Sequence, residues 1–186
     1  MDAIAAKSLV MQYIKAVKSG KRVAGEYERL AVERHMNDLK DAKRNGWRFE
    51  EYSALIAFDF FSMLKHSKGE FAGQAFELSD WQAFIVWCLF GWKRADGTRR
   101  FRYAYVEIGR KNGKTTFAAA VALYMLVLDQ EQGAEVYMAA TTRGQARICW
   151  TEAKNMVNKS PDIKEFVQGY QNTLVMDSTL SKMEPL

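Results

Sequence analysis

Apolar residues in the first third of the chain recur at intervals close to those of an α-helix. Between Ile4 and Val17 they fall on one face, and the Ser-Gly pair at residues 19–20 ends the pattern. A similar pattern resumes after Gly25, and Asn45-Gly46 interrupts it before a third apolar segment. The spacing therefore predicts three short helices, over residues 4–17, 25–39 and 49–64.

A second region begins after a loop rich in Gly and Ser at residues 66–73. In the sequence FELSDWQAFIVWCLFGW, Ser79 or Asp80 is suited to cap a helix, because a short polar side chain can accept hydrogen bonds from free backbone amides. The predicted helix is followed by a turn at Asp96-Gly97. Its expected apolar face consists of Trp81, Phe84, Ile85 and Leu89.

The remaining residues alternate between strand and helix patterns. The β-branched and aromatic run Tyr103–Ile108 predicts a strand, residues 115–128 a helix, 134–141 a second strand and 143–159 a second helix. This order favours a right-handed crossover and a parallel sheet.

Between the first predicted strand and its helix lies GRKNGKTT, at residues 109–116. Its second half matches the end of the phosphate-binding loop G-x-x-x-x-G-K-[ST], but Ile108 stands where the first glycine belongs and Gly109 follows one residue later. Because that first glycine only shapes the entry to the loop, the shift is compatible with a P-loop. A chance GKT tripeptide is the alternative, and the flanking strand and helix favour the P-loop.

Such a loop would bind ATP and Mg²⁺. Its backbone amides would surround the β-phosphate at a helix N-terminus, where the helix dipole favours anions. Gly113 allows close approach, Lys114 would reach the β- and γ-phosphates, and the Thr115 hydroxyl would bind the metal. The expected nucleotide-binding residues of the loop are Lys111, Asn112, Gly113, Lys114, Thr115 and Thr116.

Composition excludes only a few classes of protein. Apolar residues form 48% of the chain, enough for a core, and the net charge of +5 permits a nucleic-acid partner without requiring one. No apolar run approaches the length of about 18 residues that a membrane span needs. Cys88 and Cys149 lack metal-ligand spacing, which indicates two buried, reduced thiols in a cytoplasmic protein.

The loop and the sequence GAEVYMAATTRGQARICWTEAKNMV after it resemble the ATPase region of the terminase large subunits of tailed bacteriophages. Upstream, YERLAVERHMNDL resembles the helical N-terminal segment of that family, and FELSDWQAFIVWCLFGW its adenine-side glutamine motif, so the resemblance covers nearly the whole chain. It implies an α/β fold with an incomplete P-loop NTPase-type parallel sheet and flanking helices. Residues 1–70 would form a helical N-terminal segment and residues 71–186 part of the ATPase domain.

The resemblance also implies a function and partners. The full-length protein would be an ATPase and nuclease that couples ATP hydrolysis to movement of double-stranded DNA into a capsid. Its partners would be the small terminase subunit and the portal protein, with no membrane and with a homo-oligomer as an option. It would act in the cytoplasm of the bacterial host and transiently at the procapsid.

The resemblance assigns roles to single residues as well. Arg110 would reach the γ-phosphate and stabilise its charge, or else pair with an acidic neighbour and hold the loop. Gln82 would contact adenine through its amide. A role in coupling or DNA contact is implied for Thr141, Thr142, Arg143 and Gln145. A helix cap by Thr142 with a solvated Arg143 is the plainer alternative. Five basic residues could contact DNA phosphates or form a solvated hairpin tip, namely Lys93, Arg94, Arg99, Arg100 and Arg102.

The sequence departs from the family pattern in two respects. After Lys114 no apolar run ends in the Asp-Glu pair that would hold Mg²⁺ and activate water, and Asp177 is a poor substitute because Ser178 follows it. The nuclease carboxylates are also missing. We therefore expect an N-terminal piece of a longer protein that is inactive alone and either marginally stable or self-associating. The alternatives are another helicase-like P-loop protein and a non-enzymatic prophage remnant.

Overall fold

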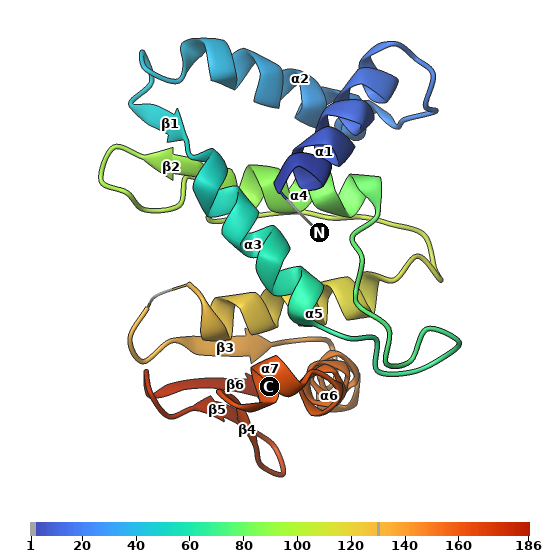
Figure 1. Cartoon of the computed structure of the whole chain (residues 1–186), viewed down its shortest axis with the longest axis vertical. Coiled ribbons are helices and arrows are strands. Elements are labelled where there is room, and N and C mark those ends of the chain that lie inside the picture. The colour runs from blue at the N-terminus through green and yellow to red at the C-terminus, as the bar shows by residue number, and fades with distance from the viewer. Residues whose placement is uncertain (1–2, 130) are drawn as a thin grey trace. The chain divides into compact units, whose positions relative to one another are not determined.

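The computed structural model describes residues 3–129 and 131–186 (Figure 1). The chain divides into two compact units. The first consists of Met1–Asp59 and Leu78–Val106, and the second of Phe60–Glu77 and Glu107–Leu186. Among the described residues, no helix combines the length and the apolar character needed to cross a bilayer.

Four helices make up most of the first unit, and all were expected from the sequence. They are α1 (Ala3–Lys18), α2 (Glu26–Asp41), α3 (Glu51–Met63), whose last turn belongs to the second unit, and α4 (Asp80–Gly91). α1 packs against both α2 and α4. Two short strands were not expected, β1 (Trp47–Phe49) and β2 (Trp92–Arg94), which pair antiparallel.

Of the two predicted candidates for the N-cap of α4, the structure selects Ser79, which forms a capping box with Gln82. The Gln82 Oε1 atom accepts a hydrogen bond from the Ser79 backbone amide at 2.9 Å. The predicted apolar face is wrong, because Trp81, Ile85 and Leu89 are only half-buried. A helix that is apolar all round gives no periodic signal from which its buried face can be read. Its buried residues are Gln82, Ala83, Phe84, Val86, Trp87, Cys88, Phe90 and Gly91.

Aromatic rings form the core of the first unit. Trp92 is fully buried, and the ring centroids of Phe49 and His35 lie 5.3 Å and 5.8 Å from its own in edge-to-face geometry. Phe49 also packs on Trp87 at 5.1 Å. Edge-to-face pairs place the positive ring edge on the negative ring face, so these contacts add to the gain from burial.

Gly91, at the end of α4, leaves no room for a side chain. A Cβ atom on it would lie 2.5 Å from Cε2 and Cζ of Phe49 and 3.3 Å from Cβ of Ala54. We expect Gly91→Ala to lower the free energy of unfolding by about 1–3 kcal/mol, because the packed Phe49 ring must move. Urea denaturation measures this, and Gly144→Ala, whose Cβ meets no atom closer than 3.9 Å, is the matched control. Equal stability of the two variants would contradict the prediction.

The second unit combines three helices with a four-stranded sheet (Figure 1). Its helices are α5 (Lys114–Val127), α6 (Arg143–Lys159) and α7 (Pro161–Lys164). Its strands are β3 (Glu135–Met138), β4 (Gln168–Gly169), β5 (Leu174–Met176) and β6 (Ser181–Pro185), in the order β3-β6-β5-β4. The expected α/β class, with helices flanking a sheet, is confirmed.

The expectation of a purely parallel sheet is wrong. Only β3 and β6 are parallel, whereas β4, β5 and β6 form antiparallel pairs. The reason is the length of the connections: short turns link β4, β5 and β6, and a short turn can join only antiparallel neighbours.

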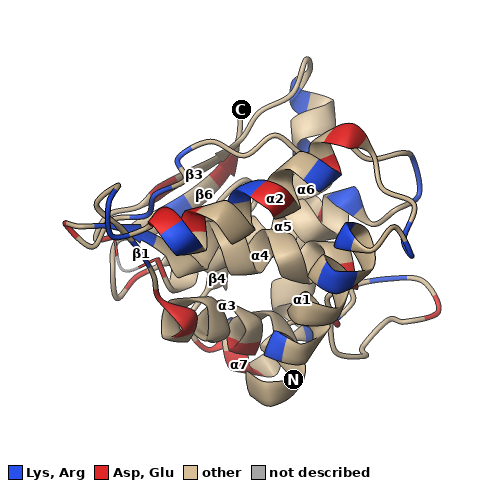
Figure 2. Ribbon diagram, turned by 90° about the horizontal axis from the view of Figure 1, so that it is seen from above, with Lys and Arg blue, Asp and Glu red and all other residues tan. Residues whose placement is uncertain are grey.

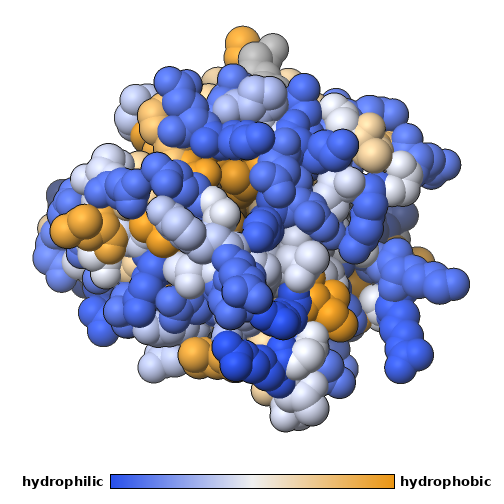
Figure 3. Space-filling model, turned by 90° about the horizontal axis from the view of Figure 1, so that it is seen from below, coloured by the Kyte–Doolittle hydropathy of each residue, from blue (hydrophilic) through white to orange (hydrophobic). Residues whose placement is uncertain are grey.

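The predicted strand Tyr103–Ile108 is also wrong, because these residues pair with no strand of the described chain. Tyr103 and Tyr105 expose 93% and 88% of their surface. The run has the composition of a strand, but β-propensity reflects how a side chain fits a pleated surface and does not supply a partner. The face seen from below is mostly hydrophilic (Figure 3).

Candidate nucleotide-binding loop

The loop before α5 opens directly into the helix N-terminus. Gly113 is the N-cap and has a left-handed backbone with φ of 71°, and Lys111 is left-handed too, with φ of 66°. Phe117 donates its amide to the Gly113 carbonyl at 2.9 Å, so the amides at 114–116 precede the first hydrogen bond of the helix. Such amides, together with the positive end of the helix dipole, favour an anion.

Two side chains of the loop close it on itself. The Lys114 ammonium donates to the Ile108 carbonyl at 2.6 Å, so the Lys114 side chain reaches back to the residue that precedes the loop. Asn112 Nδ2 donates to the carbonyls of Arg110 and Gly109, at 3.2 Å and 3.4 Å. Since the partner of Lys114 is an exposed carbonyl and no carboxylate, a phosphate oxygen can replace it without separating an ion pair.

The other predicted ligands differ in how free their side chains are. Arg110, Lys111 and Thr115 are exposed beside the loop. The Thr116 hydroxyl instead donates to Glu152 Oε1 at 3.2 Å, so it points toward α6. The expectation for Thr116 as a ligand therefore depends on its backbone amide.

A magnesium ion would obtain few ligands from the described residues themselves. No group of three or more His, Cys, Asp or Glu side chains in residues 3–129 and 131–186 is placed to hold a metal. The exposed Thr115 hydroxyl fits the way Mg²⁺ is bound in nucleotide sites, where phosphate oxygens and water supply most of the octahedron.

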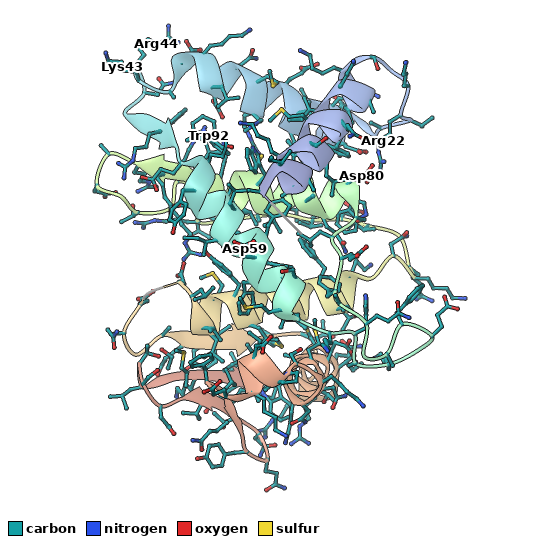
Figure 4. The ribbon with its side chains drawn as sticks, in the orientation of Figure 1. Arg22, Lys43, Arg44, Asp59, Asp80 and Trp92 are labelled. Carbon is teal, nitrogen blue, oxygen red and sulfur yellow. The ribbon has the colours of Figure 1, made fainter. Side chains whose placement is uncertain are left out.

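Gln82 belongs to the first unit, whereas the loop belongs to the second. It is 6% exposed, and its Oε1 atom is engaged by the Ser79 amide. Near it, Asp80 accepts a hydrogen bond from Arg22 Nη1 at 2.5 Å (Figure 4). Part of the hydrogen-bonding capacity of Gln82 is thus used in capping α4.

The residues after β3 form a helix cap. The Thr142 side chain accepts from the Gln145 amide at 3.3 Å, and the Thr141 hydroxyl donates to Gln145 Oε1 at 2.6 Å. Arg143 is exposed. The capping interpretation of Thr142 is therefore confirmed.

The basic cluster expected around residues 93–102 is not a uniform surface patch. Arg100 is 11% exposed in its side chain, forms an ion pair with Asp38 at 2.7 Å and lies 3.4 Å from the ring centroid of Trp47. A guanidinium can stack on an aromatic ring while its edge binds a carboxylate, so Arg100 belongs to the packing of the first unit. Along α2, basic and acidic residues are interspersed (Figure 2).

Sequence reasoning missed one buried charge beside the loop. Glu152 is 2% exposed and is one of the buried residues of α6, with Ala146, Trp150 and Met156 among the others. A glutamate within the apolar face of an amphipathic helix is the signal that could have identified it, because charged side chains are seldom buried without partners.

Comparison with known proteins gives the same family at three levels. The family model described as "Terminase large subunit, ATPase domain" matches residues 80–181, more than half of the 186 residues. The terminase large subunit of Enterobacteria phage HK97 is 31% identical over 101 residues, which are 54% of this chain and 19% of that protein.

The structural comparison agrees with the sequence comparisons. The crystal structure of the HK97 bacteriophage large terminase matches with a TM-score of 0.60 and 25% identity, over 72% of this chain and 27% of the other. The chain thus spans about a fifth to a quarter of the length of the relatives that it matches. On the family match over residues 80–181, the chain belongs to the terminase large subunit family, within its ATPase domain.

Proposed function

We propose that this chain is the ATP-binding part of a phage DNA-packaging motor, in which ATP hydrolysis drives double-stranded DNA into a capsid. The observation that carries the proposal is the loop before α5, where amides at a helix N-terminus adjoin the Lys114 ammonium within the ATPase-domain match. Terminase large subunit homology supports an ATPase role in packaging.

In this proposal different groups of the loop bind different phosphates of ATP. The amides from Lys111 to Thr116 bind the β-phosphate, and Lys114 leaves the Ile108 carbonyl to reach the β- and γ-phosphates. Thr115 contributes its hydroxyl to Mg²⁺, which supplies charge neutralisation when bound. Gly113 keeps the backbone close to the phosphates in its left-handed conformation, and Asn112 holds the loop entry through its carbonyl contacts.

Roles are also proposed for Arg110 in the second unit and for Gln82 in the first. Arg110 is exposed in the loop, where a guanidinium can stabilise charge on the γ-phosphate. Gln82 contacts adenine with the atoms that capping leaves free, since an amide NH₂ carries two donors and only Oε1 is engaged by Ser79. The catalytic contributions are those of Arg110 and Lys114.

Membership of the terminase large subunit family supports a proposal about the larger assembly. The proposed partners are double-stranded DNA, the small terminase subunit, the portal protein and further copies of the chain. We also propose that residues 1–70 form a leader and residues 71–186 part of the ATPase domain, which is supported by a family match that starts at residue 80.

Lys114→Ala tests the proposal. We expect the affinity for Mg-ATP to fall at least about tenfold, because a charge-assisted hydrogen bond to phosphate is lost. Isothermal titration calorimetry and titration with a fluorescent ATP analogue measure it. Lys164→Ala, an exposed lysine of α7, should bind like the unmodified chain. Unchanged affinity in Lys114→Ala protein that melts normally would refute the phosphate-binding loop.

A further inference from the structure

We propose that Glu152 is a positioning residue that holds the first turn of α5, and with it the amides of the phosphate loop, in place for nucleotide. The inference rests on the proposed function of that loop. It assigns to a buried carboxylate on α6 the task of fixing the residues that follow Lys114.

The first support is the set of partners of Glu152. Its Oε1 atom accepts hydrogen bonds from the Ser67 hydroxyl at 2.9 Å and from the Thr116 hydroxyl at 3.2 Å. Its Oε2 atom lies 2.9 Å from the Lys68 ammonium, in an ion pair whose angles do not meet those of a hydrogen bond. One carboxylate therefore joins α6, the start of α5 and the loop at residues 64–77.

The second support is the cost of this arrangement. Glu152 is 2% exposed, and removing a carboxylate from water costs several kcal/mol unless hydrogen bonds and an opposite charge compensate. Well-packed apolar residues often stabilise a fold as well as a buried ion pair does. A carboxylate gives what an apolar side chain cannot, namely directional bonds that fix one geometry between two helices.

The third support is a neighbouring contact of the same kind. One turn earlier on α6, Cys149 donates its thiol to the Thr115 carbonyl, with 3.7 Å between sulfur and oxygen. Burial, and then the nearby charge of Glu152, raise the pKa of Cys149 to about 11, so the thiol keeps the proton that it donates. Two residues of α6 thus contact the two residues that follow Lys114.

These contacts affect the loop because of where they act. Thr115 and Thr116 belong to the turn whose amides precede the first hydrogen bond of α5. Amides that bind phosphate must be held to within about half an ångström, and a shift of about 1 Å costs affinity or rate. The start of the 64–77 loop has a further contact at the C-cap of α6, since Lys65 donates its amide to Ser160 Oγ at 2.9 Å.

The test compares variants that separate the hydrogen bonds from the charge. Glu152→Ala removes both, Thr116→Val removes only one hydroxyl donor, and Glu152→Gln keeps an oxygen acceptor. Thr151→Val, at an exposed threonine of the same helix, is the matched control. Two readouts apply to the 186-residue chain: hydrogen–deuterium exchange of the peptide that opens α5, and affinity for Mg-ATP by calorimetry.

We expect faster exchange at the start of α5 and affinity roughly tenfold weaker in Glu152→Ala and Thr116→Val, with no further loss in the double variant, because both remove the same bond. Glu152→Gln should retain most of the affinity, and Thr151→Val all of it. If Glu152→Ala does not fold, Thr116→Val and Glu152→Gln decide the outcome.

Different outcomes separate this inference from the proposed function. Affinity that is lost in Lys114→Ala but unchanged in Thr116→Val and Glu152→Ala would overturn the inference and leave the nucleotide site standing. Additive losses, or unchanged exchange at the start of α5, would also overturn it. A chain that binds no nucleotide at all would overturn both.

Discussion

Trp92→Ala is expected to lower the free energy of unfolding of the first unit by about 3–5 kcal/mol, the largest effect of any single substitution proposed for this chain. Trp92 is fully buried, its ring meets Phe49 and His35, and its Nε1 atom donates to His35 Nδ1 at 3.0 Å. The substitution leaves both a cavity and a buried nitrogen without its donor. Both costs lower the free energy of unfolding, the first through lost ring packing and the second through an acceptor left without a hydrogen bond.

Urea denaturation followed by circular dichroism measures this change. Trp92→Phe should cost less than Trp92→Ala, since it keeps an aromatic ring in the cluster and loses only the N–H donor and part of the volume. Tyr52→Ala, at an aromatic residue of α3 that is 75% exposed, should stay within about 0.5 kcal/mol of the unmodified chain. A Trp92→Ala protein as stable as Tyr52→Ala would show that the aromatic cluster does not form.

Acidification from pH 7 to pH 4 is expected to destabilise the protein by about 3 kcal/mol through His35 alone. Burial lowers the pKa of His35 from 6.5 to about 4, while nearby Asp38 raises the pKa and Arg34 and Arg100 lower it. Protonation would also place a hydrogen on Nδ1, which now accepts from Trp92 Nε1 (Figure 4 labels Trp92).

The direction of this pH effect depends on whether the folded or the unfolded chain binds the proton. Between pH 6.5 and pH 4 the unfolded chain protonates this histidine and the folded chain does not, so unfolding is favoured as the pH falls. The contribution of His35 is fully present above pH 6.5 and is lost as the pH falls toward 4. The carboxylates of the chain also make stability depend on pH. Their contribution is removed by comparing the protein with a variant at position 35.

His35→Gln provides that subtraction, because a glutamine oxygen can still accept from Trp92 but does not titrate. The free energy of unfolding of the two proteins, measured by urea titration at half-unit steps between pH 7 and pH 4, should converge as the pH falls. Parallel curves would mean that His35 is exposed or charged in the folded protein.

Most helices could be predicted from the sequence because their signals are local. Spacing of apolar residues, the cap at Ser79 and the break at Asn45-Gly46 act within a few residues, and α1, α2, α5 and α6 lie where these signals place them. Strands depend on partners. The run Tyr103–Ile108 has strand composition but belongs to no strand in the described residues, whereas β1 and β2 pair across more than forty residues without a strong pattern in either.

The candidate site likewise has features that the sequence predicts and features that it does not. The loop could be located from GKT, because Gly113 and Lys114 act through backbone conformation and a helix terminus that neighbouring residues create. The hydrogen bond from Thr116 to Glu152 could not be predicted from the sequence, because it joins residues 36 positions apart through the packing of α5 on α6. From the sequence, Arg100 is expected to be a surface charge. Only its contacts with Asp38 and Trp47 show that its side chain is largely buried.

By itself, the sequence determined where most helices begin, where the GKT loop lies, and which family the chain resembles, since capping, glycine conformation and the phosphate motif are properties of short segments. Only the tertiary structure decided that the sheet is mixed, which face of α4 is buried, and that Glu152 accepts a hydrogen bond from Thr116 in the first turn of α5. The physical reason is that pairing and burial depend on residues distant in the chain, whose approach no local pattern encodes.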